Sequence, residues 1–329
     1  MTDEQIVQVR RFNRIVTQRV GALDEEFLSR SRPLGQARVL WEIGPEGADL
    51  RSLRARLGLD SGYLSRVLQA LAADGLVLVE PSEADGRVRT ARLTRAGGAE
   101  RAELDRRNDA VASSILDALG DAQRERLVSA MAEVERLLTA SMVDVEPCDP
   151  EHQHARFSLH SYFDELDARF EGGFDPRRGS SDAPADLVPP AGLLLVATLR
   201  GEPVGCGVLR HHDGRRGRPR WSEIKRLWVA PSVRGLGLGR RLLVALEDRA
   251  AQAGAPVVRL DTNRVLTEAI AMYRAGGYRE IARFNDNPYA HHWFEKELAS
   301  RSRRLRRQVE TAANTRSTNA ASGTDPAQA

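Results

Sequence analysis

Apolar residues recur at helical spacing along the first part of the chain, and turn residues divide the pattern into separate helices. Thr2 or Asp3 could cap the opening helix, whose apolar stripe begins soon afterwards. Pro33 begins a second helix that stops at Gly44, and a third helix stops at Gly58. The pattern therefore predicts three consecutive amphipathic helices.

A fourth helix follows after a short turn. Asp60 or Ser61 could cap it, and Gly75 is its expected C-terminal stop. The third and fourth helices, joined by the turn Gly58-Leu59-Asp60, have the dimensions of a helix-turn-helix. The apolar face of the fourth helix carries Leu64, Val67, Leu68 and Leu71.

The period then changes to that of strands. Leu76–Glu80 and Val88–Leu93 are strand-like and flank a charged turn, which predicts a β-hairpin with a charged tip. Thr94 could cap a long helix to about Leu119. Asp121 could cap a further helix to about Ala140. The order is helix-turn-helix, hairpin and two long helices.

This order resembles the MarR family of winged-helix regulators over residues 1–142. Asp85-Gly86-Arg87, followed by Leu93-Thr94, matches the D-x-R … L-T wing pattern of that family. The resemblance implies a homodimer formed by the terminal helices. Such a dimer would bind double-stranded DNA at a pseudo-palindromic operator, with half-sites roughly 10 bp apart.

The polar face of the fourth helix supplies the candidate DNA contacts. Arg66 and Gln69 could reach base edges in the major groove, while hydroxyl groups could bind phosphates. Arg87 at the wing tip could enter the minor groove. The alternative is an ordinary solvated helix face, but its place between a helix-turn-helix and a wing favours DNA. The helix candidates are Ser61, Tyr63, Ser65, Arg66 and Gln69.

The second half of the chain alternates strand-like and helical segments, which indicates α/β architecture. A helix is expected over His154–Phe170. A second helix is expected over Leu266–Ala275. The expected strands are Leu193–Leu199, Val204–Arg210, Ile224–Val229, Val257–Leu260, Tyr278–Phe284 and His292–Leu298.

A glycine-rich loop after Ile224–Val229 is the most informative segment of this half. Gly235, Gly237 and Gly239 alternate, and a helix is expected to begin near Arg240. Glycines let backbone N–H groups approach a phosphate, and the positive end of a helix dipole favours the same anion. The spacing matches neither the dinucleotide fingerprint nor the P-loop.

The segment resembles instead the Gcn5-related N-acetyltransferases (GNAT), over residues 151–299. The matching features are Arg234-Gly235-x-Gly237-x-Gly239, Asn263 after a strand, and the helix end Ala271–Tyr278. The resemblance implies a mixed, largely antiparallel sheet and acetyl-CoA as co-substrate. Its expected cofactor contacts are Leu227, Val229, Arg234, Gly235, Leu236, Gly237, Leu238, Gly239, Arg240 and Asn263.

Two residues are candidates for catalysis. Tyr273 lies where the GNAT family places the acid that protonates the departing thiolate; the alternative is a tyrosine that packs its helix onto the sheet. Glu223 shares an expected strand face with Lys225, Leu227 and Val229, which would point it toward the reaction cleft as a base acting through water. An ion pair with Lys225 or an arginine is an equally good interpretation of Glu223.

Length, charge and cysteine spacing limit which other classes of protein this chain could belong to. The 329 residues suffice for two domains, and a net charge of +3 is too small to establish a nucleic-acid partner by itself. No apolar run has the length of a membrane span, and Cys148 and Cys206 fit no metal or redox spacing. A cytoplasmic protein without a metal site is expected.

The predicted organisation is multidomain. An α-rich winged helix with a small β wing (1–142) precedes a linker (143–150), an α/β GNAT domain (151–299) and a basic, disordered tail (300–329). The function expected is that of a DNA-binding regulator that also transfers acetyl groups from acetyl-CoA to a primary amine, such as a small molecule. One alternative is a regulator that only senses acetyl-CoA; another is an enzyme that uses its first half as a dimerisation scaffold.

Overall fold

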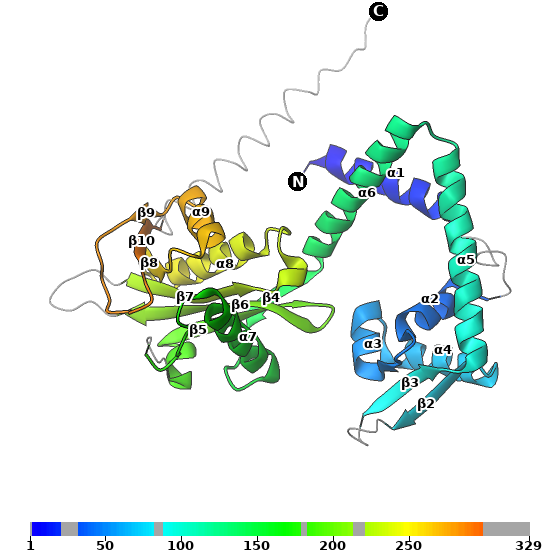
Figure 1. The fold of residues 1–329 in the computed structure, drawn as a ribbon, viewed down its shortest axis with the longest axis horizontal. Coiled ribbons are helices and arrows are strands. Elements are labelled where there is room, and N and C mark those ends of the chain that lie inside the picture. Colours follow the sequence, from blue (N-terminus) through cyan, green and yellow to red (C-terminus); the bar gives the residue numbers. More distant parts are fainter. Residues whose placement is uncertain (1, 21–31, 82–87, 179–182, 213–220, 299–329) are drawn as a thin grey trace, which may run out of the picture. The chain divides into compact units, whose positions relative to one another are not determined.

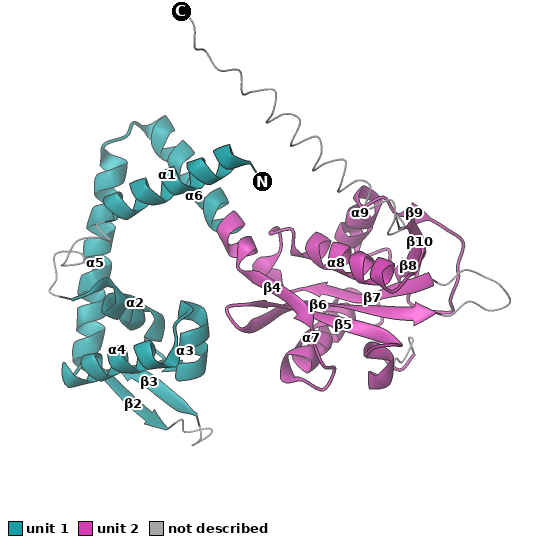
Figure 2. Cartoon of the chain, turned by 180° about the vertical axis from the view of Figure 1, so that it is seen from behind, with its two compact units in different colours: residues 1–136 teal, residues 137–329 magenta. Residues whose placement is uncertain are grey.

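The structure is a computed structural model of the chain, and it describes residues 2–20, 32–81, 88–178, 183–212 and 221–298. The chain divides into two compact units, Met1–Arg136 and Leu137–Ala329 (Figure 2). The helix that crosses this division is continuous. Arg87, a candidate DNA contact, and the tail 300–329 lie outside the described residues.

Three of the helices in unit 1 begin with a side-chain cap, at the predicted positions Thr2 and Asp60 and, without a prediction, at Asp49. Thr2 accepts a hydrogen bond from the Gln5 amide, Asp49 from the Ser52 amide, and Asp60 from the Tyr63 amide, at the first turns of α1, α3 and α4. Each bond satisfies an amide that has no partner within its helix. The helices are α1 (Asp3–Arg19), α2 (Leu34–Ile43), α3 (Leu50–Leu57) and α4 (Ser61–Ala73).

The wing of unit 1 is a three-stranded sheet. Strand β3 (Arg89–Leu93) pairs antiparallel with both β2 (Val77–Pro81) and β1 (Ala48–Asp49). Thr94 caps α5 (Arg95–Asp117) through the Gly97 amide, 3.0 Å away. The expected hairpin is confirmed, and the short β1 is an addition that joins the start of α3 to the wing.

One apolar core holds α2, α3, α4, α5 and the sheet of unit 1 together (Figure 1). The buried side chains of α4 are the four that its helical periodicity predicts. In the described part of the chain, α1 and α6 (Asp121–Ser141) bury no residue. Most of their large apolar side chains, including Phe12 and Met131, are exposed.

Unit 2 is built on a mixed sheet of seven strands in the order β4-β5-β6-β7-β8-β10-β9. Neighbouring strands are antiparallel except β7 and β8, which are parallel. This confirms the mixed, largely antiparallel sheet. The strands are β4 (Val143–Pro147), β5 (Gly192–Leu199), β6 (Glu202–His212), β7 (Trp221–Val229), β8 (Val257–Thr262), β9 (Arg279–Glu280) and β10 (His292–Glu297).

Helices cover both faces of this sheet (Figure 1). Along β5, Leu194 and Val196 enter the apolar cluster beneath α7 (Gln153–Arg169). Leu195 and Ala197 enter the cluster beneath α8 (Leu238–Gln252) and α9 (Thr267–Ala275). Because successive side chains of a strand point to opposite faces, a continuously apolar strand must be covered on both.

Residues 143–150, expected to be a linker, are in part a strand of the sheet. Val143–Pro147 form β4, which pairs antiparallel with β5 along its whole length. Val143 is fully buried in the core of unit 2. The proline and charged residues of this segment suggested a loop, but an edge strand tolerates both because one side of it makes no ladder bonds.

A β-bulge in β7 overturns the expected strand face of Glu223. Cys206 pairs with Trp228 and Val208 with Lys225, so two steps along β6 match three along β7. The extra residue lies at Arg226, whose φ is +51°. A bulge of this kind reverses the alternation of side chains. Leu227 packs on the α8 face with Ile224, and Glu223 therefore does not share its face.

Two further boundaries differ from the sequence-based expectation. The strand expected over Tyr278–Phe284 is only Arg279–Glu280, because the chain then leaves the sheet as a loop. Helix α8 begins at Leu238, directly after Gly237 in a left-handed conformation, rather than near Arg240. The glycine loop is consequently shorter and tighter than expected.

Candidate functional site

The polar face of α4 in unit 1 has the exposure that a DNA-reading helix requires. Ser61, Ser65, Arg66 and Gln69 are exposed, while the four apolar residues of the helix are buried. Tyr63 is 37% exposed, and its hydroxyl lies close to Gly35 at the start of α2. Arg66 and Gln69 are therefore accessible along one side of α4, and Tyr63 lies nearer the body of the unit.

A groove beside α4 adds cations that the sequence analysis did not single out. Arg51 and Arg54 of α3 and Arg89 of β3 line it together with Ser61, Ser65 and Gln69. Positive side chains next to hydroxyl and amide groups suit a phosphate backbone. The pair Arg51 and Arg54, one turn apart on a short helix, was the signal available in the sequence.

In unit 2, the glycine loop forms a cradle at the N-terminus of α8. Gly235 and Gly237 have φ values of +80° and +75°, which L-residues other than glycine rarely adopt. A Cβ at either position would meet no atom within 4 Å, so open space lies beside both. The first bond into α8 is donated by the Arg241 amide to the Gly237 carbonyl, at 3.0 Å. The amides before it belong to the unpaired first turn, which attracts anions.

Arg234, expected to contact the cofactor, is already held by the protein. Its Nε donates to the Val229 carbonyl at 3.1 Å, and its Nη2 pairs with Glu165 of α7 at 2.5 Å. Glu165 also accepts from Trp228 Nε1 at 3.0 Å. The guanidinium thus bridges α7 and the end of β7 at the entrance to the glycine loop, while Arg240 is exposed on α8.

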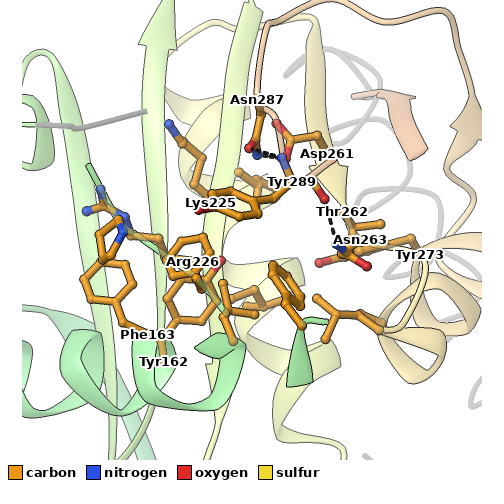
Figure 3. Close-up of a pocket in the computed structure, with 18 residues that line it drawn as sticks. Tyr162, Phe163, Lys225, Arg226, Asp261, Thr262, Asn263, Tyr273, Asn287 and Tyr289 are labelled. Atoms are coloured by element: carbon orange, nitrogen blue, oxygen red, sulfur yellow. Dashed lines mark hydrogen bonds between the residues drawn. The ribbon is translucent and has the colours of Figure 1, made fainter. Parts of the chain in front are cut away.

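A cavity opens in unit 2 where β7 and β8 separate (Figure 3). The two strands pair only at Ser222 with Val258 and at Glu223 with Arg259. Beyond that point the bulge at Arg226 bends β7 away, and the space between the strands is lined by residues of both. The lining residues are Tyr162, Phe163, Leu166, Phe170, Phe174, Pro176, Ile224, Lys225, Arg226, Leu227, Asp261, Thr262, Asn263, Leu266, Ala269, Tyr273, Asn287 and Tyr289.

Tyr273 of α9 is one wall of this cavity (Figure 3). Its ring is buried and packs 5.7 Å from Tyr278 and 6.0 Å from Phe294. Burial and the charge of Asp261 raise the pKa of Tyr273 above its ordinary range. A phenol is protonated at neutral pH, as a proton donor must be, and burial preserves that state for Tyr273. Both the packing and the acid interpretation of Tyr273 are compatible with this position.

Glu223 is not one of the described residues that line the cavity. Its carboxylate is hydrogen-bonded to His212 Nε2 at 2.9 Å and accepts from Asn285 Nδ2 at 3.2 Å. Burial would raise the pKa of Glu223, but the bond to His212 and the charge of Lys225 hold it below the ordinary value. Glu223 is therefore held within the protein by a hydrogen bond to His212, where an ion pair with Lys225 or an arginine was expected.

Asp261, which the sequence analysis missed, is the carboxylate that lines the cavity (Figure 3). It accepts from Asn285 Nδ2 at 2.5 Å and from Asn287 Nδ2 at 2.8 Å. Burial raises the pKa of Asp261 above its usual value. Its position directly before Thr262-Asn263, at the end of a strand, was the signal available in the sequence.

Asn263 lines the same cavity, but its side chain makes two bonds within the protein. Its Nδ2 donates to the Tyr289 carbonyl at 2.8 Å, and its Oδ1 accepts from the Val265 amide at 3.1 Å. These bonds attach the loop before β10 to the end of β8. A contact between Asn263 and a cofactor, as expected, would have to use the second N–H of Nδ2 or the second lone pair of Oδ1.

Sequence families agree with the two units. Residues 29–88 match the MarR family model, and residues 159–278 match the model of the acetyltransferase (GNAT) family. The chain joins a MarR-family segment to a GNAT-family segment. The GNAT segment contains the glycine loop, the bulged strand and Tyr273, so the resemblance read from the motifs is confirmed.

Individual relatives match less than a third of this chain. An "IAA acetyltransferase" from Azospirillum brasilense is 39% identical over 95 residues, which are 29% of this chain and 58% of that protein. A "Mycothiol acetyltransferase" from Sanguibacter keddieii is 40% identical over 89 residues, 27% of this chain and 28% of that protein. The chain spans less than two thirds of the length of these curated relatives.

A solved structure of a putative acyl-CoA N-acyltransferase from Klebsiella pneumoniae aligns with 48% of this chain and 99% of its own, at 25% identity and a TM-score of 0.37. Within the described ranges of our structure, no helix is long and apolar enough to cross a bilayer. The same ranges contain no group of three or more His, Cys, Asp or Glu side chains placed to hold a metal ion.

Proposed function

We propose that unit 2 transfers the acetyl group of acetyl-CoA to the primary amine of a small molecule. The observation that supports this most strongly is that the bulged strand β7 leads into the glycine cradle at one end and lines the cavity, which Tyr273 also lines. Acetyl-CoA supplies an activated acetyl thioester. Its pyrophosphate suits the amides from Gly235 to Arg240 and the exposed charge of Arg240.

In this proposal, different residues of unit 2 bind the cofactor, shape the cavity and donate a proton. Leu227 and Val229 offer backbone groups at the free edge of β7, where a pantetheine chain can pair as an added strand. Leu236 and Leu238 anchor the loop in the core below the cradle. Asn263 holds the cavity wall, and Tyr273 protonates the departing thiolate, which removes the cost of releasing it as an anion.

The incoming amine must lose a proton before it attacks. For a lysine-like amine this costs about 4–5 kcal/mol at pH 7, and for an α-amino group about 1 kcal/mol. Glu223 could act only through a water chain, because it does not line the cavity and Asn285 presents a donor amide to it. The carboxylate of Asp261 faces the cavity directly and is the better acceptor for this proton.

We propose that unit 1 binds double-stranded DNA as a homodimer. The exposed face of α4 and the arginine-lined groove beside it support DNA binding, with Arg66 and Gln69 reading bases. The exposed apolar side chains of α1 and α6 support the dimer, because such surfaces on terminal helices are normally covered by a partner. The proposed operator is pseudo-palindromic, and Ser61, Tyr63, Ser65 and Arg87 complete the proposed contacts.

Two arrangements compete with a bifunctional cytoplasmic protein. Unit 2 could bind acetyl-CoA without turnover and report it to the DNA-binding unit, or unit 1 could serve only as a dimerisation scaffold. The first test is a screen of primary amines for release of CoA thiol by the full-length protein. Turnover with any amine excludes the pure sensor, while binding of acetyl-CoA without turnover excludes the enzyme. A gel-shift titration with genomic fragments tests the scaffold alternative.

A further inference from the structure

One side of the cavity in unit 2 is walled by aromatic rings. Phe163 and Phe170 both contact Phe174, with ring centroids 5.9 and 5.8 Å apart. Tyr289 lies 4.8 Å from Phe174 and 5.8 Å from Phe170. Helix α7, the loop after it and the loop before β10 contribute these rings, and Tyr162 of α7 extends the wall (Figure 3). A surface of this kind favours a flat, apolar group.

The charged residues that line the same cavity are Lys225, Arg226 and Asp261. Two cations and one anion give the lining a net charge of +1. Arg226 lies over the ring of Phe163, 5.6 Å from its centroid, so its charge is beside the aromatic wall. A small amine that carries only a positive charge is therefore opposed by the cavity as a whole.

The three charges are arranged so that a cation and the anion are neighbours. Lys225 and Arg226 come from the bulge of β7, and Asp261 comes from β8 across the opening (Figure 3). Lys225 is close enough to Asp261 to affect its ionisation. Each carboxylate oxygen of Asp261 accepts one hydrogen bond from a side-chain amide, that of Asn285 or that of Asn287. Both oxygens therefore keep a lone pair for a further hydrogen-bond donor.

An α-amino acid carries the complementary pair of charges, an ammonium and a carboxylate on one carbon. Its ammonium matches Asp261, and its carboxylate matches Lys225 and Arg226. Its side chain would then lie against the rings of α7 and Tyr289. An α-amino acid with an aromatic side chain therefore uses the anion, the two cations and the aromatic wall together.

We infer that the acceptor is an α-amino acid with an aromatic side chain, with Asp261 as its ammonium site and Lys225 and Arg226 as its carboxylate site. The inference rests on the acetyl transfer proposed above. The ammonium gives one proton to Asp261 and then to water, and the nitrogen attacks the acetyl carbonyl carbon. The C–N bond forms as the C–S bond breaks, and the thiolate takes a proton from Tyr273. The amide nitrogen returns a proton through Tyr273, so the products are the N-acetyl amino acid, CoA thiol and one proton released.

The test compares analogues that each lack one of the recognised groups. CoA-thiol release is measured with L-phenylalanine, with 2-phenylethylamine, which lacks the carboxylate, and with L-alanine, which lacks the ring. We expect kcat/KM for L-phenylalanine to exceed both by about 10-fold or more, because a site built around a polar group rejects the analogue without it. Equal or higher kcat/KM for 2-phenylethylamine would overturn the inference.

Substitutions locate the carboxylate site. Lys225→Met should lower kcat/KM for L-phenylalanine about 10-fold, mainly through KM, and should lower kcat/KM for 2-phenylethylamine much less. Lys225→Arg, which keeps the charge, should restore most of the preference. Arg249→Gln is a control of equal charge change, since Arg249 is exposed on α8 and does not line the cavity. An equal loss for both substrates in Lys225→Met would contradict the assignment.

Binding separates this inference from the proposed activity. Calorimetry measures L-phenylalanine, 2-phenylethylamine and 3-phenylpropionate on the full-length protein with CoA present, for the native chain and for Asp261→Asn. If L-phenylalanine binds preferentially and Asp261→Asn abolishes this binding, the inference is supported even when no amine releases CoA thiol. The absence of CoA-thiol release would then overturn only the proposed acetyl transfer. Turnover of other amines without binding of L-phenylalanine would overturn the inference and leave the activity standing.

Discussion

The recognition face of α4 and the cavity of unit 2 are both candidate binding sites, but they are built in opposite ways. The α4 face consists of side chains from one helix of 13 residues, exposed because their neighbours at helical spacing are buried. The cavity is assembled from α7, β7, β8, α9 and the loop before β10, over a stretch from Tyr162 to Tyr289. A helix face is a local property, whereas a cavity depends on where strands separate.

The same contrast determines how each site responds to substitution. On α4, Arg66 and Gln69 are solvated, so removing either affects a partner more than it affects folding. In the cavity, Tyr273 is packed between Tyr278 and Phe294, and Asp261 holds two asparagines of the neighbouring loop. Function and stability are therefore coupled in unit 2 and separable on α4.

The largest expected effect is at the cradle. Gly237→Glu places a carboxylate where an anion is proposed to bind and forces a non-glycine residue to a φ of +75°. We expect acetyl-CoA affinity, measured by calorimetry, to fall about 100-fold or more. Gly254→Glu is the matched control, because Gly254 has a φ of +86° at the far end of α8. Retained affinity in Gly237→Glu would disprove the cradle.

Tyr273→Phe removes one hydroxyl and keeps the ring. We expect kcat to fall about 10²-fold with little change in acetyl-CoA affinity, because the proton donor contributes at the transition state. Tyr278→Phe is the control in the same aromatic cluster, since its hydroxyl bonds to Glu247 at 3.0 Å and serves packing. If both variants lower thermal stability and neither lowers kcat, Tyr273 has the packing role.

On α4 the expected effect is smaller. Arg66→Ala should weaken operator binding by about 1–3 kcal/mol and relax the preference at one base pair, if Arg66 reads a base. The measurement is a gel-shift titration with the operator and with single-base variants. Arg106→Ala on the exposed surface of α5 makes the same change of charge. A uniform loss across all sequences would assign Arg66 to a phosphate instead.

The smallest effect concerns the scaffold of unit 1. Thr94 accepts from the Gly97 amide and donates to the Gly75 carbonyl at 2.7 Å, so it joins the start of α5 to the turn after α4. Thr94→Ala should lower the free energy of unfolding of unit 1 by about 1 kcal/mol. Thr94→Ser retains the hydroxyl and should recover most of this. Chemical denaturation measures it, and an unchanged midpoint would mean that the cap contributes nothing.

Most of the fold could be predicted because its signals are local. Asp60 and Thr94 cap their helices as the spacing indicates, and the glycine loop precedes its helix. The failures were at positions where a neighbour decides. Val143 becomes part of a strand only because β5 offers an open edge, and the strand expected after Tyr278 is shortened because the chain leaves the sheet while its partner β10 continues to His292.

Only part of the candidate site could be predicted, because only part of it has a local signal in the sequence. Tyr273 was found from a motif, and the structure adds its place in the cavity wall. Glu223 was assigned to the wrong face because strict alternation was assumed along β7, and no residue type in that strand announces the bulge at Arg226. Asp261 was missed because its importance comes from facing that bulge across the sheet.

The sequence by itself determined the two families, most helix caps, the exposed polar face of α4 and the glycine cradle, since each depends on residues a few positions apart. Only the tertiary structure decided where β7 and β8 separate, and with it which charges and rings meet in one cavity. That separation follows from a single extra residue in a ladder of backbone hydrogen bonds. The ladder forms between distant segments, so its register becomes visible only when both strands are in place.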